Sequence, residues 1–188
     1  MVAWITAAAW AAEPSGPREE WAALVATGCD LAKAEVETPL EARVLRNTPY
    51  ALAGHRFQSA ALTAFFTADG DWYRPRDAEA PLDAAALACV QKIAALEPAL
   101  QRQAPMSDGL VDRMLRDPRV FRTLRMWSRL PGPTYAEVHA SHDPDGTWTW
   151  ASGIPGCPGG HAADGTECGG YGVRCGPEGE PCDTVASG

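Results

Sequence analysis

Large apolar side chains recur at helical spacing through much of the first 130 residues. The segment 82–96 shows this most clearly, because its apolar residues follow the period of about 3.6 expected of an amphipathic helix. Besides Leu52, the segment 46–75 holds seven large apolar or aromatic residues, namely Tyr50, Phe57, Leu62, Phe65, Phe66, Trp72 and Tyr73. The pattern predicts helices whose apolar faces pack into a core.

Helix-start signals divide this helical region. Thr38-Pro39-Leu40-Glu41 fits a capping box with proline at the first helical position. Ser59, Ser107 and Asp117 are predicted to cap further helices. Thr48-Pro49 repeats the cap-and-proline signal. Either a second short helix begins there, or one helix kinks because Pro49 removes a backbone hydrogen bond.

Beyond residue 130 the pattern is typical of strands. Residues 134–141 and 147–152 contain β-forming residues on either side of an Asp145-Gly146 turn, which predicts a β-hairpin. From Gly153 onward, glycine and proline are frequent and few residues suit a core. The chain is therefore predicted to be mainly α-helical, a small helical domain followed by a C-terminal β-hairpin and a Cys-rich, loop-rich tail.

The first residues resemble a truncated signal peptide. Residues 1–12 are apolar and Ala9-Trp10-Ala11 suits signal peptidase, but no basic residue precedes the run. A frayed or buried apolar N-terminus is the alternative. The predicted segments are the truncated signal peptide (1–12), a linker (13–20), the central helical domain (21–105), a helical extension (106–130), the hairpin (131–152) and the Cys-rich tail (153–188).

The cysteines favour an oxidising compartment. Cys29 and Cys89 are predicted to form a disulfide that adds roughly 4 kcal/mol by the loop-entropy model, the alternative being two buried thiols. The spacing of the four tail cysteines does not fit a zinc ribbon, so two disulfides are expected among three open pairings. These residues are Cys157, Cys168, Cys175 and Cys182.

Charge is unevenly placed along the chain. The net charge is −8, but residues 102–129 carry seven basic and three acidic groups. Six arginines recur at intervals of three or four and would form a basic ridge on one continuous helix: Arg113, Arg116, Arg119, Arg122, Arg125 and Arg129. Such a ridge would dock an anionic envelope polymer or the acidic tail, or would be a solvated helix face. The acidic balance argues against nucleic acid as a partner, and no apolar run is long enough for a transmembrane span.

The segment of about 40–100 resembles the YARHG domain, a small bacterial module presumed to be extracellular. The matching positions are Arg46-Asn47, Tyr50-Ala51, Gly54, Phe57, Ser59, Leu62, Phe65-Phe66, Trp72-Tyr73 and Pro75. The arginine and histidine of the motif are replaced by Leu52 and Ala53. The resemblance implies an extracytoplasmic location (periplasmic, cell surface or secreted), but no established activity.

Five residues are predicted to line a binding groove where the first half of this segment meets the Trp72-Tyr73 return: Arg46, Asn47, His55, Arg56 and Tyr73. Trp72 is expected in the core and Tyr73 at the rim with a free hydroxyl. The alternative is that Arg46 pairs with a carboxylate such as Glu97 while Asn47 bonds to loop backbone.

No catalytic residue, cofactor or metal ligand is predicted. Recognisable nucleophile, phosphate-binding and dinucleotide motifs are absent from the sequence. His139 and His142 fall on opposite faces of a predicted strand, and Asp143 and Asp145 suit a turn rather than a metal site.

The favoured function is a non-catalytic binding or adaptor module of the bacterial envelope or the secreted space. Its expected partner is a cell-wall or envelope polymer, or another envelope protein. A small envelope-polymer hydrolase and a purely structural stalk domain are the alternatives.

Overall fold

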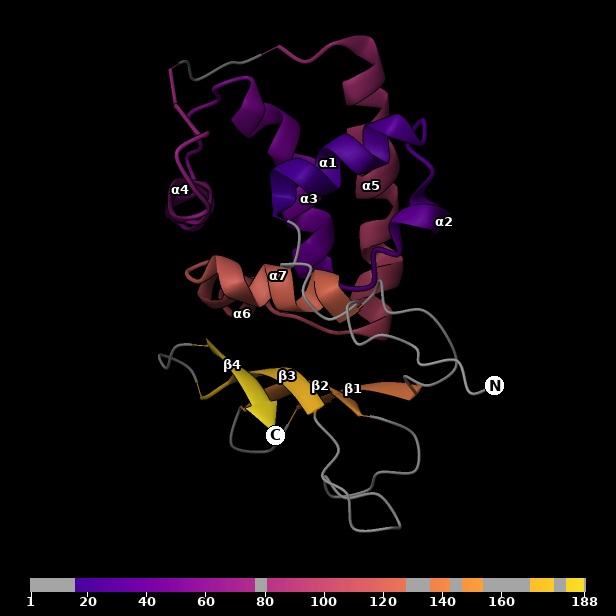
Figure 1. Cartoon of the computed structure of the whole chain (residues 1–188), viewed down its shortest axis with the longest axis vertical. Coiled ribbons are helices and arrows are strands. Elements are labelled where there is room, and N and C mark those ends of the chain that lie inside the picture. Colours follow the sequence, from indigo (N-terminus) through magenta and orange to yellow (C-terminus); the bar gives the residue numbers. More distant parts are fainter. Residues whose placement is uncertain are drawn as a thin grey trace, which may run out of the picture.

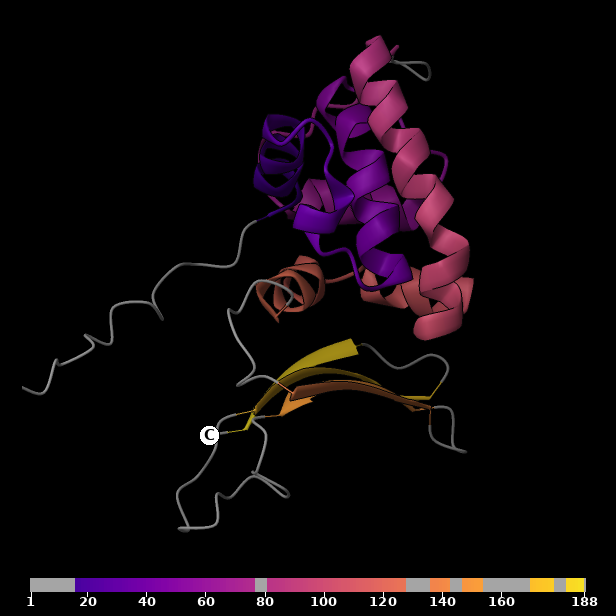
Figure 2. The ribbon, with the colours of Figure 1, turned by 90° about the vertical axis from the view of Figure 1, so that its right-hand side faces the viewer.

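The computed structural model describes residues 16–76, 81–127, 136–142, 147–153, 170–177 and 182–187. The helices are α1 (Pro17–Ala26), α2 (Leu31–Ala34), α3 (Pro39–Leu52), α4 (Ala60–Ala68), α5 (Ala84–Gln103), α6 (Asp108–Met114) and α7 (Pro118–Trp127). The strands are β1 (Ala136–His142), β2 (Trp148–Gly153), β3 (Gly170–Cys175) and β4 (Cys182–Ser187). Figures 1 and 2 show the sheet as a separate layer next to α6 and α7. This arrangement confirms the predicted fold class.

The helix α3 begins as the sequence predicts and settles one open question. Thr38 Oγ1 accepts a hydrogen bond from the backbone N–H of Glu41, and the Glu41 carboxylate accepts one from the backbone N–H of Thr38. The helix continues through Pro49 to Leu52. The Thr48 hydroxyl donates to the carbonyl of Val44 rather than capping a second helix. One helix therefore spans both proline signals.

The helix α1 starts earlier than the sequence suggests. It begins at Pro17, inside the segment assigned to a linker, with Pro17 in the first turn and Glu19 and Glu20 beside the positive end of the helix dipole. Trp21 and Leu24 are buried and contribute to the helical core. Residues 17–20, which were assigned to the linker, are therefore helical, with Arg18 and Glu19 exposed and Glu20 buried.

A disulfide joins the N-terminal helices to α5. Cys29 follows α1 and Cys89 lies on the buried face of α5, and their sulfur atoms are bonded at 2.02 Å, as predicted. On the same face, Val90 and Ile93 are buried. The helix α5 extends through Pro98 to Gln103, so the apolar stripe of residues 82–96 covers only its first part.

The predicted arginine ridge does not form. The helices α6 and α7 are separated by Leu115–Asp117, so the arginines do not share one helix face. Arg119 pairs with Asp117, and Arg122 pairs with Asp69. Arg129 lies outside the described residues. A new helix begins after Asp117, because the Asp117 carboxylate accepts the backbone N–H of Arg119 and so caps α7.

Arg125 is the largest fully buried side chain in the described part of the protein, with 1% of its surface exposed. Its guanidinium contacts the carboxylates of Glu20 and Glu41 at 2.9 and 3.0 Å. It also donates hydrogen bonds to the carbonyl oxygens of Ala34 and Glu35. This group, called the Arg125 cluster below, ties α7 to α1, to α3 and to the C-terminal end of α2.

The sheet is an antiparallel meander in the order β1-β2-β3-β4. Its first two strands are the predicted hairpin. The next two belong to the tail that was expected to be rich in loops, and Cys175 and Cys182 are disulfide-bonded at the end of this second hairpin. Val173 and both of these cysteines are buried in the same core as the helices. Cys157 and Cys168 lie outside the described residues.

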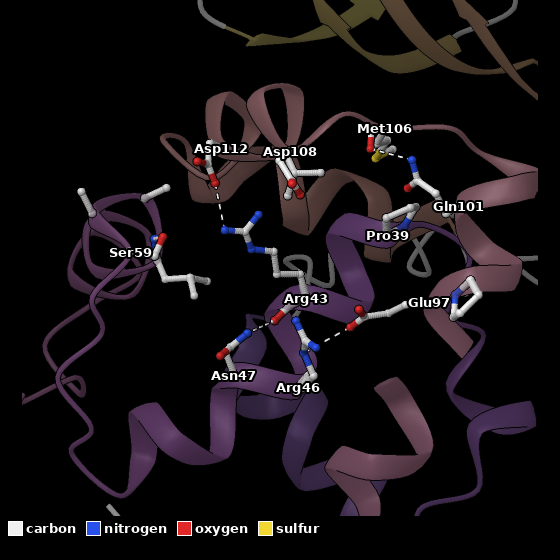
Figure 3. A pocket seen from close by; sticks show the side chains of 15 residues that line it. Pro39, Arg43, Arg46, Asn47, Ser59, Glu97, Gln101, Met106, Asp108 and Asp112 are labelled. Carbon is white, nitrogen blue, oxygen red and sulfur yellow. Dashed lines mark hydrogen bonds and ion pairs between the residues drawn. The ribbon is translucent and has the colours of Figure 1, made fainter. Parts of the chain in front are cut away.

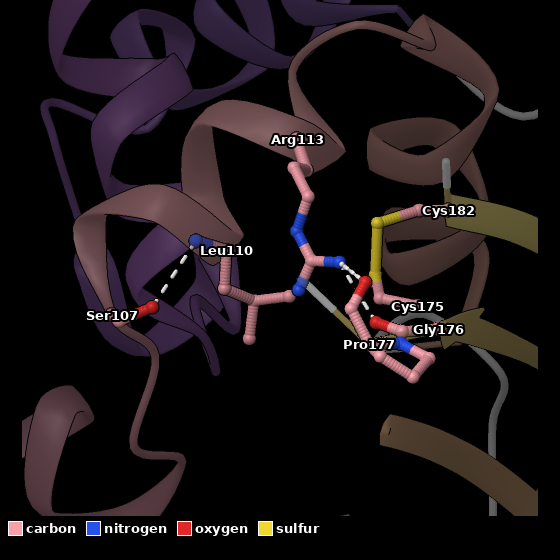
Figure 4. The surroundings of a disulfide bond; sticks show 7 residues. All are labelled: Ser107, Leu110, Arg113, Cys175, Gly176, Pro177 and Cys182. Carbon is pink, nitrogen blue, oxygen red and sulfur yellow. Dashed lines mark hydrogen bonds between the residues drawn. A yellow bond between two sulfur atoms is a disulfide. The ribbon is translucent and has the colours of Figure 1, made fainter. Parts of the chain in front are cut away.

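Arg113 fastens the sheet to the helical body. One terminal nitrogen of its guanidinium donates to the carbonyl oxygens of Gly176 and Pro177, each at 2.7 Å (Figure 4). These carbonyls directly follow Cys175, so the disulfide holds the turn that Arg113 contacts. One arginine of the proposed ridge therefore does bind the tail, but through backbone carbonyls rather than acidic side chains.

Replacing Arg125 with methionine should lower the free energy of unfolding by about 3–5 kcal/mol, because Glu20 and Glu41 would stay buried without their counter-charge. Urea unfolding followed by circular dichroism measures the change. Arg116→Met is the matched control, since the Arg116 side chain is exposed, and should change stability by less than about 0.5 kcal/mol. Equal stabilities of the two variants would contradict the structural role of the Arg125 cluster.

Removing the Cys29–Cys89 disulfide should cost more stability than removing the Cys175–Cys182 disulfide. The first joins residues 60 apart and the second joins residues 7 apart. The loop-closure model therefore gives about 4 and about 2 kcal/mol for the two alanine double variants. Thermal unfolding under non-reducing conditions tests the order. A larger loss from the shorter loop would show that chain entropy does not control these bonds.

Candidate functional site

The candidate site is a cavity of about 850 Å³ between four helices, called the α3–α6 cleft below. Its walls come from α3, the start of α4, the end of α5 and the beginning of α6 (Figure 3). The lining residues are Pro39, Arg43, Arg46, Asn47, Ser59, Ala60, Ala61, Leu62, Glu97, Pro98, Gln101, Met106, Asp108, Val111 and Asp112. Charged and small apolar side chains thus share one open cavity.

The α3 wall follows from helical geometry. Positions 39, 43, 46 and 47 lie at intervals that bring them to one face of the helix. The opposite side of α3 carries Leu40, Val44 and Leu45, which are buried in the core. Because the core fixes the rotation of α3, the side chains of Arg43 and Arg46 are directed toward α5 and α6.

Each arginine of the cleft faces a carboxylate on a different helix. An Arg43 nitrogen lies 2.9 Å from Asp112 Oδ1 on α6, and Arg46 Nε lies 3.1 Å from Glu97 Oε1 on α5. All four side chains are partly exposed, between 22% and 47%. Such half-solvated pairs contribute about 0–1 kcal/mol, so they position the helices only weakly.

These two ion pairs are close but poorly aligned. Asp112 Oδ1 and Glu97 Oε1 are both buried atoms without a hydrogen bond of good geometry. Charge and distance therefore hold each pair, while most of the donor capacity of each guanidinium is not used within the described residues. A guanidinium carries five N–H groups in a planar fork that suits a carboxylate.

The cleft contains two of the five predicted binding residues. Arg46 and Asn47 line it, whereas His55, Arg56 and Tyr73 do not. The contacts of the first two also follow the alternative prediction in part. Arg46 pairs with Glu97, and Asn47 Nδ2 donates to the carbonyl of Arg43 at 2.7 Å, which is helix backbone rather than loop backbone.

The prediction for Tyr73 was wrong, and the prediction for Trp72 holds only in part, because Trp72 packs against the core without being fully buried. Tyr73 is only 3% exposed, and its hydroxyl donates to the carbonyl of His55 at 2.9 Å. Trp72 is only partly buried, and its indole N–H donates to the Asp69 carboxylate. The Tyr73 ring packs in the core against Phe57 and Phe66. The aromatic cluster therefore includes Tyr73 as its buried member, while Trp72 lies nearer the surface.

His55 and Arg56 therefore do not form a groove with Arg46. Arg56 is exposed and its guanidinium approaches the carbonyl of Arg76 at 3.5 Å. The His55 ring contacts the rings of Tyr50 and Phe57. Both residues lie in the segment that follows α3, and neither lines the cleft.

Sequence reasoning missed Arg43, Asp108 and Asp112 as site residues. Arg43 lies three residues before Arg46 on the same helix face, and this spacing was a usable signal. The two aspartates belong to α6, whose approach to α3 depends on tertiary packing. No local pattern could have placed them in the cleft.

The described residues contain neither a candidate metal site nor a candidate membrane-spanning helix. No group of three or more His, Cys, Asp or Glu side chains suited to a metal ion occurs there. His139 and His142 fall on β1, whereas Asp143 and Asp145 lie outside the described residues. None of the described helices combines the length and apolar character needed to cross a membrane.

Residues 18–98 match the family model of the YARHG domain. The match begins well before residue 40, where the resemblance was recognised, and so includes α1 and Glu20. No curated protein and no solved structure matches the chain.

Tyr73→Phe should lower the free energy of unfolding by about 1 kcal/mol, because the carbonyl of His55 loses its partner in a largely buried site. Chemical denaturation gives the value, with the exposed Arg74→Gln substitution as a neighbouring control. A phenylalanine variant as stable as the wild-type protein would indicate that the Tyr73 hydroxyl is hydrated instead.

Proposed function

The chain contains a YARHG domain over residues 18–98, and from this premise we propose that it is a non-catalytic binding module outside the cytoplasm. It acts in the bacterial envelope or the secreted space, and its α3–α6 cleft holds a segment of cell-wall or envelope polymer. The observation that carries this proposal is a cavity of about 850 Å³ into which two under-used guanidinium groups project.

The location is supported by chemistry as well as by the domain type. The YARHG domain is an extracytoplasmic type of module. Two disulfides, Cys29–Cys89 and Cys175–Cys182, are formed in the described part of the chain. Disulfides persist mainly in oxidising compartments, which agrees with an envelope or secreted protein.

The side chains of the cleft favour binding over catalysis. The Ser59 hydroxyl oxygen accepts the backbone N–H of Leu62 as a helix cap. The carboxylates of Glu97 and Asp112 each face an arginine. A nucleophile or general base needs a partner that activates it, and these groups are occupied in other contacts.

The α3 wall of the cleft is rigidly positioned. Glu41 lies two residues before Arg43. Its carboxylate caps the first turn of α3 and also binds the Arg125 guanidinium. Leu40, Val44 and Leu45 pack the other side of the helix into the core. A binding site on a fixed helix loses little conformational freedom when it takes up a ligand.

The double variant Arg43→Gln/Arg46→Gln should reduce retention of the purified protein on insoluble bacterial envelope material by at least about tenfold, since each lost charged contact is worth about 1.4 kcal/mol or more. A sedimentation assay measures retention. Its stability should fall by no more than about 2 kcal/mol, because both intramolecular pairs are partly exposed.

The matched control is Arg18→Gln/Arg74→Gln, which removes the same charge from two exposed positions outside the cleft. It should keep its retention. Unchanged retention of the cleft variant would overturn the proposed site. Release of soluble fragments from the envelope material by the wild-type protein would favour a hydrolase. A large loss of stability with no retention by any form would favour a structural stalk.

A further inference from the structure

We propose that the α3–α6 cleft recognises a zwitterionic peptide segment with small apolar side chains. Its carboxylate binds the guanidinium groups of Arg43 and Arg46, and its ammonium group binds the carboxylate of Asp108. This assignment rests on the proposed binding function and adds the chemical class of the ligand.

The charges of the cleft favour a ligand that carries both a positive and a negative charge. Its lining holds two arginines and three carboxylates, those of Glu97, Asp108 and Asp112. A polyanion would gain the arginines but would also meet all three carboxylates, and a simple cation would meet both guanidiniums. A zwitterion places each of its charges against the opposite one, so neither end is repelled.

The two arginines can accept a carboxylate without breaking their own pairs. Each has one close contact with a protein carboxylate, and that contact is poorly aligned. The remaining N–H groups of each planar fork suit an incoming carboxylate in bidentate geometry. Figure 3 shows Arg43 directed toward Asp112 of α6 and Arg46 directed toward Glu97 of α5, both along the wall of the cavity.

Asp108 is the carboxylate best placed for a ligand cation. It is exposed and makes no ion pair with any described residue, whereas Asp112 and Glu97 each face an arginine. It lies at the start of α6, across the cavity from α3. Asp108 is therefore the carboxylate of the lining that has no arginine against it among the described residues.

The apolar part of the lining suits small apolar side chains. Ala60, Ala61 and Leu62 come from α4, and Val111 and Met106 come from the opposite wall. A cavity of about 850 Å³ falls in the range of about 300–1,000 Å³ found for compact organic ligands. A peptide of a few alanine-sized residues fits both the volume and the lining.

Four probes separate the two charges of such a ligand: trialanine, N-acetyl-trialanine, trialanine amide and the doubly blocked peptide. Titration at pH 6.5, followed by the amide chemical shifts of the full-length protein, gives the four dissociation constants. Trialanine should bind most tightly, each singly blocked peptide about tenfold more weakly, and the doubly blocked peptide weakest.

Substitutions then assign each charge to its partner. Asp108→Asn should remove the preference for trialanine over its N-acetyl form and leave the preference over the amide. Arg43→Gln/Arg46→Gln should do the reverse. Asp71→Asn and Arg18→Gln/Arg74→Gln, which change exposed charges outside the cleft, should preserve both preferences. Asp108 is exposed, so its variant is expected to fold even if the arginine variant does not.

The outcomes distinguish this assignment from the broader function. Equal binding of trialanine and its N-acetyl form would overturn the ammonium site and leave a carboxylate site. If no peptide binds but the envelope material still retains the protein through Arg43 and Arg46, the peptide assignment is wrong and the binding function stands. If the peptides bind as expected but the envelope material retains nothing, the peptide site stands and the proposed envelope function is wrong.

Discussion

The buried Arg125 guanidinium is the interaction on which the helical body depends. Burial by itself lowers the pKa of Arg125, but the carboxylates of Glu41 and Glu20 outweigh that effect and raise it. The charged form therefore stays in the interior, held by two carboxylates and by the carbonyls of Ala34 and Glu35. The same crowding acts on Glu37, whose pKa is raised by burial and by the nearby charges of Glu41 and Glu35.

This cluster sets the extent of the folded unit. The YARHG match ends at residue 98, yet Arg125 lies 27 residues further along the chain. Glu20 and Glu41 lie inside the match and are almost fully buried. A chain that stopped at residue 98 would remove the Arg125 guanidinium from both buried carboxylates, at a cost of several kcal/mol. The helices α6 and α7 are therefore part of the same structural unit as the matched segment, and α6 also supplies one wall of the cleft.

What the sequence could predict depended on how local the determining interaction was. The capping box at Thr38, the cap at Ser59 and the hairpin around β1 and β2 are each fixed within a few residues, and all were predicted. The Cys29–Cys89 bond was also predicted, and the Arg46–Glu97 pair was the stated alternative to a binding role for Arg46. The burial of Tyr73 was not, because Trp72 and Tyr73 are adjacent and only the packing of Phe57 and Phe66 decides which ring turns inward.

Arg43 and Arg125 show the same limit of sequence-based prediction, and they also show how the proposed binding is compatible with stability. Arg43 and Arg125 look alike in sequence, but one is partly solvated at a cleft and the other is sealed in the interior. An exposed pair is worth about 0–1 kcal/mol, whereas breaking a buried one costs about 3–5 kcal/mol. Arg43 can therefore exchange or share its carboxylate partner with a ligand at little cost, while Arg125 keeps its partners. Glu41 joins the Arg125 cluster to the first turn of α3. The backbone of the cleft is therefore held in place, while its charged side chains can change partners when a ligand binds.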